Sequence, residues 1–180
     1  MVGAIDLQAA GWVNGVHSVL KTPFDPADHS TSALAVNDLG QIVGSDFHTL
    51  TGERGSLFWN GPSDQSPAVV PQGTGTGTPE AINDAGVIVG SGSLAGGEVG
   101  AVAWPPPPSA HQYLKGFDGG PCTTDDPKFT DMALDVSRTG AIVGVCHTAS
   151  GLRHPVYWSD LNAVAIDLEP TSTGSGFATG

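Results

Sequence analysis

Side chains that could act as acids, bases or ligands follow each copy of a recurring Val-Gly dipeptide. They are Asp6, Asp46, His48, Ser93, Cys146 and His147. Imidazole titrates near neutral pH, and beside a carboxylate it can serve as a general acid or base. If the copies converge on one axis, these groups meet at one mouth of the fold. We therefore take His48, His147, Asp46 and Asp6 as catalytic candidates. The alternative is that polar residues leaving a strand simply face solvent.

Other residues suggest binding rather than catalysis. Trp12 could stack on a sugar or another planar ligand, or be partly buried in the core. Together with Ser93 and Cys146, it forms our set of candidate ligand contacts. Two histidines and two aspartates at one mouth could also hold a transition metal.

Loop carboxylates raise the question of calcium. They are Asp25, Asp28, Asp125, Asp126 and Asp131, none at the spacing of a known calcium loop. We expect solvated acidic turns and no resident metal or cofactor, with calcium as the alternative.

The two cysteines leave two possibilities open. Cys122 and Cys146 could form one disulfide in an oxidising compartment, or remain two thiols. Their spacing matches no paired zinc knuckle. A bridge would pin the segment around Cys122 and stabilise the fold by roughly 3 kcal/mol. A free Cys146 beside His147 would instead be a candidate redox thiol.

These residues are positioned by an internal repeat. Three segments align without gaps: 35–45, 81–91 and 135–145. Each predicts a strand, a tight turn with Asn or Ser before a Gly, and a second strand rich in β-branched residues. A third strand ending in Trp is predicted at 56–59, 101–104 and 155–158. A weaker fourth strand is predicted at 68–70, 112–114 and 164–168. Four short strands per unit are typical of a propeller blade.

We divide the chain into one repeat domain with units 1–40, 41–86, 87–140 and 141–180, and an insertion loop at 105–130. Residues 1–3 read as the end of a second strand and 15–20 as the third strand of unit one. A strand at 175–179 pairing with residues 1–4 would then close a four-bladed all-β propeller. In a competing alignment residues 4–7 form a fourth strand, and the chain is an open array or part of a larger ring.

Composition limits the function further. Six basic and 18 acidic residues give a net charge of −12, which disfavours nucleic acid and anionic membranes as partners. No apolar run is long enough to span a bilayer, and no signal peptide is evident at the N-terminus.

The repeat resembles the bacterial HAF-repeat family, in which Ala-x-x-Ile-Asn-x-x-Gly-x-Ile-Val-Gly-x-Ser precedes an Ala-Phe-x-Trp strand and Asp-Leu-Gly. Residues 33–168 carry the resemblance, with departures at Ser137-Arg138 in place of Asn-Asp, at the missing Trp of unit one and at Glu169 in place of Gly. It implies β-repeat architecture and an extracellular location, although a cytoplasmic one stays open. It implies no activity.

Functionally, no motif for a known reaction is present, so we expect a non-catalytic module that binds a small molecule, a carbohydrate or a protein. The alternative is a small enzyme, a cyclase, lyase or hydrolase, that uses the His and Asp candidates as acid and base.

Overall fold

The computed structural model describes residues 1–5, 8–70, 76–93, 98–106, 109–124, 130–171, 174 and 176. Over these residues the fold is all-β and antiparallel, as predicted, and its strands form four sheets. No helix capable of crossing a membrane occurs among them. Sheet 1 contains β1 (Val2–Ile5), β2 (Gln8–Val13) and β3 (Val16–Val19).

In each of the other three sheets, the four strands of the repeat lie side by side in the order in which they occur along the chain. Sheet 2 is β4 (His29–Val36), β5 (Ile42–His48), β6 (Arg54–Trp59) and β7 (Ala68–Val69). Sheet 3 is β8 (Thr76–Ile82), β9 (Ile88–Ser93), β10 (Val99–Trp104) and β11 (Gln112–Tyr113), with β12 (Thr123–Thr124) also paired to β10. Sheet 4 is β13 (Met132–Val136), β14 (Ile142–His147), β15 (Arg153–Trp158) and β16 (Ile166–Asp167). The predicted unit boundaries thus fall near the turn between the first and second strands.

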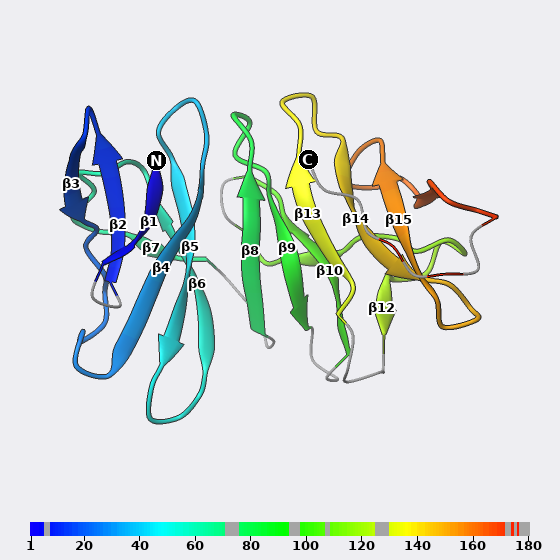
Figure 1. Ribbon diagram of the computed structural model, residues 1–180, viewed down its shortest axis with the longest axis horizontal. Helices are drawn as coiled ribbons and strands as arrows, with labels where there is room; N and C mark the ends of the chain where they lie inside the picture. Colours follow the sequence, from blue (N-terminus) through cyan, green and yellow to red (C-terminus); the bar gives the residue numbers. More distant parts are fainter. Residues whose placement is uncertain are drawn as a thin grey trace.

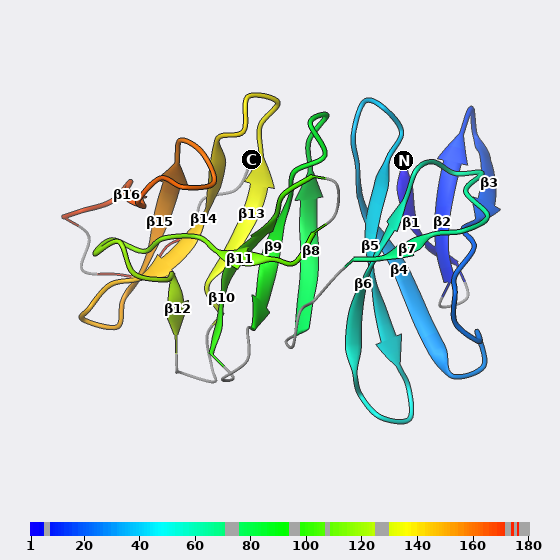
Figure 2. The same ribbon diagram turned by 180° about the vertical axis from the view of Figure 1, so that it is seen from behind.

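The sheets stand in a row in chain order, as Figures 1 and 2 show. The first strand of each sheet packs across the preceding sheet: β4 on sheet 1, β8 on sheet 2 and β13 on sheet 3. Each interface holds one hydrophobic cluster with one fully buried tryptophan, in order Trp59, Trp104 and Trp158. The prediction that the repeated tryptophans are core residues is confirmed. Two of their indoles also donate to loop carbonyls, those of Lys21 and Lys115.

The repeated Val-Gly dipeptide has a steric cause. In sheets 2, 3 and 4 the first strand carries a β-bulge, a local shift in register. Opposite each bulge stands the glycine of the second strand, Gly44, Gly90 or Gly144. A Cβ there would overlap a carbonyl oxygen of the bulged strand. Only glycine permits this approach. The turn glycines Gly40, Gly86 and Gly140 have a different role, since their φ angles of 80°, 79° and 92° are left-handed, as the turn prediction requires.

The same turns also tie the sheets together. Asn83 Oδ1 accepts hydrogen bonds from two backbone amides of its own turn, those of Ala85 and Val87, each at 3.0 Å. Its Nδ2 donates to the Ser137 carbonyl of sheet 4 at 2.9 Å. Asn37 of sheet 2 donates in the same way to the Asn83 carbonyl, also at 2.9 Å. The repeated asparagine is therefore both a turn former and an inter-sheet link.

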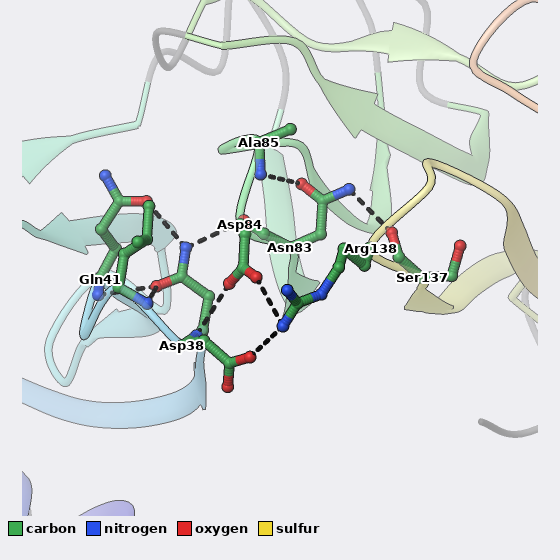
Figure 3. A network of polar contacts seen from close by, with 9 residues as sticks. Asp38, Gln41, Asn83, Asp84, Ala85, Ser137 and Arg138 are labelled. Carbon is green, nitrogen blue, oxygen red and sulfur yellow. Dashed lines mark hydrogen bonds and ion pairs between the residues drawn. The ribbon is translucent and has the colours of Figure 1, made fainter.

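Arg138 extends this link across three sheets. Figure 3 shows its guanidinium between the carboxylates of Asp38 and Asp84, the latter at 3.1 Å. The backbone amide of Asp38 also donates to Asp84 at 2.9 Å. Sheets 2, 3 and 4 therefore converge at their first turns. Sheet 4 carries Ser137-Arg138 where the repeat has Asn-Asp. Arg138 therefore places a positive charge between the carboxylates of Asp38 and Asp84.

Unit one corrects the sequence alignment. Gly3 pairs with Ala10 as Gly44 pairs with Leu57, so β1 is a second strand, as predicted, and Ala4 and Ile5 belong to it and not to a fourth strand. Asp6 and Leu7 of the competing alignment lie outside the described residues. Trp12 then occupies the position of Trp59, and Val16–Val19 is the fourth strand rather than the third. The connection from β1 to β2 is shorter than in later units, so Trp12 follows its glycine by nine residues instead of 14 or 15. An alignment that assumes a fixed spacing between the glycine and the tryptophan therefore misses the equivalence of Trp12 with Trp59.

Ring closure is not confirmed. Sheets 1 and 4 lie at opposite ends of the row (Figures 1 and 2). The Gly176 amide donates to the Arg153 carbonyl of β15 at 2.8 Å, at the sheet 4 end. Ser175 and residues 177–180 of the predicted closing strand lie outside the described residues.

Candidate functional site

A cavity of about 540 Å³ lies between the predicted insertion and the β14–β15 hairpin of sheet 4. Its lining residues are Glu98, Gly116, Phe117, Asp118, Pro121, Thr123, Thr124, Cys146, His147, Thr148, Ala149 and Gly151. Two of the predicted site residues, Cys146 and His147, are among them. A second cavity of about 460 Å³, between sheets 2 and 3, has none of them in its lining. We therefore take the first cavity as the candidate site.

The insertion is held against sheet 4 by covalent and polar links. Cys122 and Cys146 form a disulfide, with their Cα atoms 5.7 Å apart, which confirms the bridged alternative. The Lys115 carbonyl accepts hydrogen bonds from Trp158 Nε1 at 2.7 Å and from the Ala165 amide at 3.2 Å. Few apolar residues occur between 115 and 124, so these links position the wall of the cavity.

His147 is paired with a buried carboxylate. Its Nδ1 lies 2.5 Å from Asp131 Oδ1, and Asp131 is fully buried. Burial raises the pKa of Asp131, while the hydrogen bond to His147 and the charge of Arg153 act in the opposite direction. The pair resembles the carboxylate–imidazole arrangement that orients a general base. Sequence analysis had placed Asp131 among solvated loop acids, and that prediction was wrong for this residue.

The other predicted histidine belongs to a different cluster. His48 packs edge-on against His29, with ring centroids 4.5 Å apart, and His29 stacks on Phe24. Asp46 Oδ2 lies 2.9 Å from His29 Nδ1, so the histidine that Asp46 contacts is His29 and not His48. Each predicted histidine thus has partners in its own sheet, and a joint role of His48 and His147 stays a prediction. His29 was missed because only the β4–β5 register places it opposite His48.

The remaining candidates are dispersed. Ser93 Oγ lies 3.2 Å from Thr76 Oγ1 at the end of the β8–β9 ladder. Trp12 is partly buried, over Gly3 and 6.4 Å from the His17 ring, on the face of sheet 1 turned away from sheet 2. Asp6, Asp125 and Asp126 lie outside the described residues. Asp25 accepts from the Ala27 amide at 2.9 Å within its own turn. Those of these positions that the structure describes form no common site.

One more pair was not anticipated. His154 Nδ1 lies 2.8 Å from Asp167 Oδ2, joining β15 to the end of β16. His154 is buried, and among the described residues its Nε2 has no hydrogen-bond partner. Nothing in the repeat pattern marks this pair, because sheets 2 and 3 carry glycines, Gly55 and Gly100, at the position equivalent to His154.

Comparisons of the chain with protein-family models, with curated proteins and with solved structures gave no match. The resemblance to HAF repeats therefore depends on the repeated motif alone.

Proposed function

We propose that this protein is a non-catalytic binding module whose ligand occupies the cavity between the insertion and sheet 4. The observation that carries the proposal is the cavity itself. Its walls come from two chain segments that a disulfide joins, and its volume of about 540 Å³ falls in the usual range for small-molecule sites. Such a disulfide persists outside the reducing cytosol, which supports the proposal of an extracellular protein.

The lining favours a small ligand that carries an ammonium group. It contains the carboxylates of Glu98 and Asp118 and the ring of Phe117, and the described lining residues include no lysine or arginine. Glu98 is held by Thr123 Oγ1 at 2.9 Å, and Asp118 accepts from the Gly120 amide at 2.9 Å. Carboxylates attract a cation, and an aromatic face adds a cation–π contact. The chain's net charge of −12 acts in the same direction at long range.

Nitrogen-15 NMR titration tests this function. We expect spermidine and choline to shift the amides of 116–120, 122–124 and 146–151, and glucose to shift none of them. The double variant Glu98→Gln/Asp118→Asn should weaken binding about tenfold or more, since two opposing charges are removed. Glu53→Gln, an exposed change in the loop between β5 and β6, is the matched control. Shifts spread over the whole surface, or an equal response to glucose, would contradict the proposal.

A second candidate function follows from the His147–Asp131 pair. An enzyme of the cyclase, lyase or hydrolase type would use His147 as acid or base, at the 2.5 Å contact with Asp131. One-dimensional proton spectra of the probe in the same samples separate the two functions, because a binding module returns its probe unchanged. New resonances from a converted probe, lost in His147→Gln, would favour the enzyme.

We further propose that the four sheets are blades of a propeller-like array. Face-to-face packing of successive antiparallel sheets of three to five strands and convergence of three first turns on Arg138 support this. Small-angle X-ray scattering tests whether the array is open. A compact 180-residue domain has a radius of gyration of about 16 Å, and we expect a larger value for a row of blades. A value at or below that figure would indicate a closed ring.

A further inference from the structure

The disulfide lies in a set of three metal-ligand side chains, of which Cys146 alone also lines the candidate cavity. A sulfur atom from each of Cys122 and Cys146 and a carboxylate oxygen of Asp131 all lie within 4.8 Å of one another. All three residues are buried, with exposures of 1%, 2% and 0%. While the sulfur atoms are bonded to each other they are poor ligands, because the thiolate is the form that binds metals.

Asp131 supplies an independent indication of a ligand. Among the described residues, its Oδ2 has no hydrogen-bond partner, although the side chain is fully buried. A buried carboxylate oxygen without a partner is costly, and a bound ion is one of the arrangements that would satisfy it. His147 holds the other oxygen at 2.5 Å and so fixes the orientation of the carboxylate. At metal sites, hydrogen-bond partners of this kind orient the side chains that bind the metal directly.

We infer that the reduced protein binds a thiophilic divalent cation such as Zn²⁺ through Cys122, Cys146 and Asp131. Zinc takes sulfur ligands at about 2.3 Å and carboxylate oxygens at about 2.0–2.2 Å, so donors within 4.8 Å of one another fit one ion with little backbone movement. Three protein ligands leave a fourth position for water. Cys146 lines the cavity, which gives the ion a path to the site. The inference is independent of the proposed ligand function.

The chemistry requires a reductant, for which we name a phosphine. The phosphorus atom attacks one sulfur and breaks the S–S bond. Water then converts the phosphorus to the phosphine oxide, and its two hydrogens leave both sulfurs as thiols. Metal binding next forms two S–metal bonds and releases the two thiol protons to the buffer. The oxidised protein has no free thiols at this site, so the disulfide and the bound metal cannot be present in the same molecule.

Cobalt titration tests the inference. The full chain is reduced with tris(2-carboxyethyl)phosphine, desalted without oxygen, and titrated with Co²⁺ alone. We expect one Co²⁺ per chain, with sulfur-to-cobalt charge-transfer absorption and the intense visible bands of tetrahedral cobalt. The oxidised protein should show neither, and Zn²⁺ should displace the cobalt and bleach both features.

Variants assign the ligands. Asp131→Asn should weaken cobalt binding about tenfold or more, and Cys122→Ser/Cys146→Ser should abolish the charge-transfer band, because a single cysteine replacement leaves one thiolate. Asp135→Asn on β13 is the matched control, because its side chain accepts only from its neighbouring Val136 amide among the hydrogen bonds resolved there. Circular dichroism verifies that each variant is folded. A reduced wild type that takes up no cobalt, a spectrum without sulfur charge transfer, or an Asp131→Asn protein that binds as tightly as wild type would each overturn the inference.

Discussion

Reduction of the Cys122–Cys146 disulfide should lower the free energy of unfolding by about 3–4 kcal/mol, on the chain-entropy model for a closed loop of this length. The bridge joins residues separated by 24 positions, and both cysteines are buried in the cluster between sheets 3 and 4. For a domain of this size, such a loss corresponds to a fall of roughly 10 °C in Tm. Scanning calorimetry of oxidised and phosphine-reduced protein, both in excess chelator, measures the difference.

The chelator matters because metal bound to the reduced thiols would restore part of the lost stability. Cys122→Ser/Cys146→Ser is the control, since reductant should leave its Tm unchanged. A reduced wild type that melts within 2 °C of the oxidised protein would show that Trp158, Ala165 and Lys115 hold the insertion without the bridge.

Much of the array could be predicted because its determinants are local and repeated. A turn of Asn, Asp and Gly, two β-branched residues and a Trp recur at nearly fixed spacing, and the strands of sheets 2, 3 and 4 lie where that pattern placed them. The disulfide was one of two open alternatives. Its formation depends on the insertion folding back on sheet 4, which composition alone does not decide.

The site was harder to predict, because its partners are distant in sequence and unrelated to the repeat. Asp131 and His147 meet across the β13–β14 hairpin, and Asp46 pairs with His29 rather than His48. Equivalent positions were expected to converge on one axis. The convergence that the structure shows is at the opposite ends of the strands, where Arg138 joins Asp38 and Asp84. Register and bulges decide such contacts, and neither can be read from residue type.

The inter-sheet role of the repeated asparagine gives the second large prediction. Replacing Asn83 with alanine should lower the free energy of unfolding by about 2–4 kcal/mol, because three backbone groups lose their partner at a side chain that is 95% buried. These are two amides of its own turn and the Ser137 carbonyl of the next sheet. Urea unfolding followed by tryptophan fluorescence measures the change, and each inter-sheet interface contains one buried tryptophan that reports on it.

Asn83→Ser separates the two roles. Ser137, at the equivalent position of sheet 4, accepts from the Ala141 amide through its hydroxyl at 3.0 Å, so serine can form the turn. Serine at 83 lacks the second nitrogen that reaches the next sheet. Its cost should therefore lie between wild type and Asn83→Ala. Asn162→Ala, at an exposed position in the turn between β15 and β16, is the control and should change stability by less than about 0.5 kcal/mol. If Asn83→Ser were as stable as wild type, the asparagine would be a turn former alone, and sheet-on-sheet packing would hold the array together without the ladder.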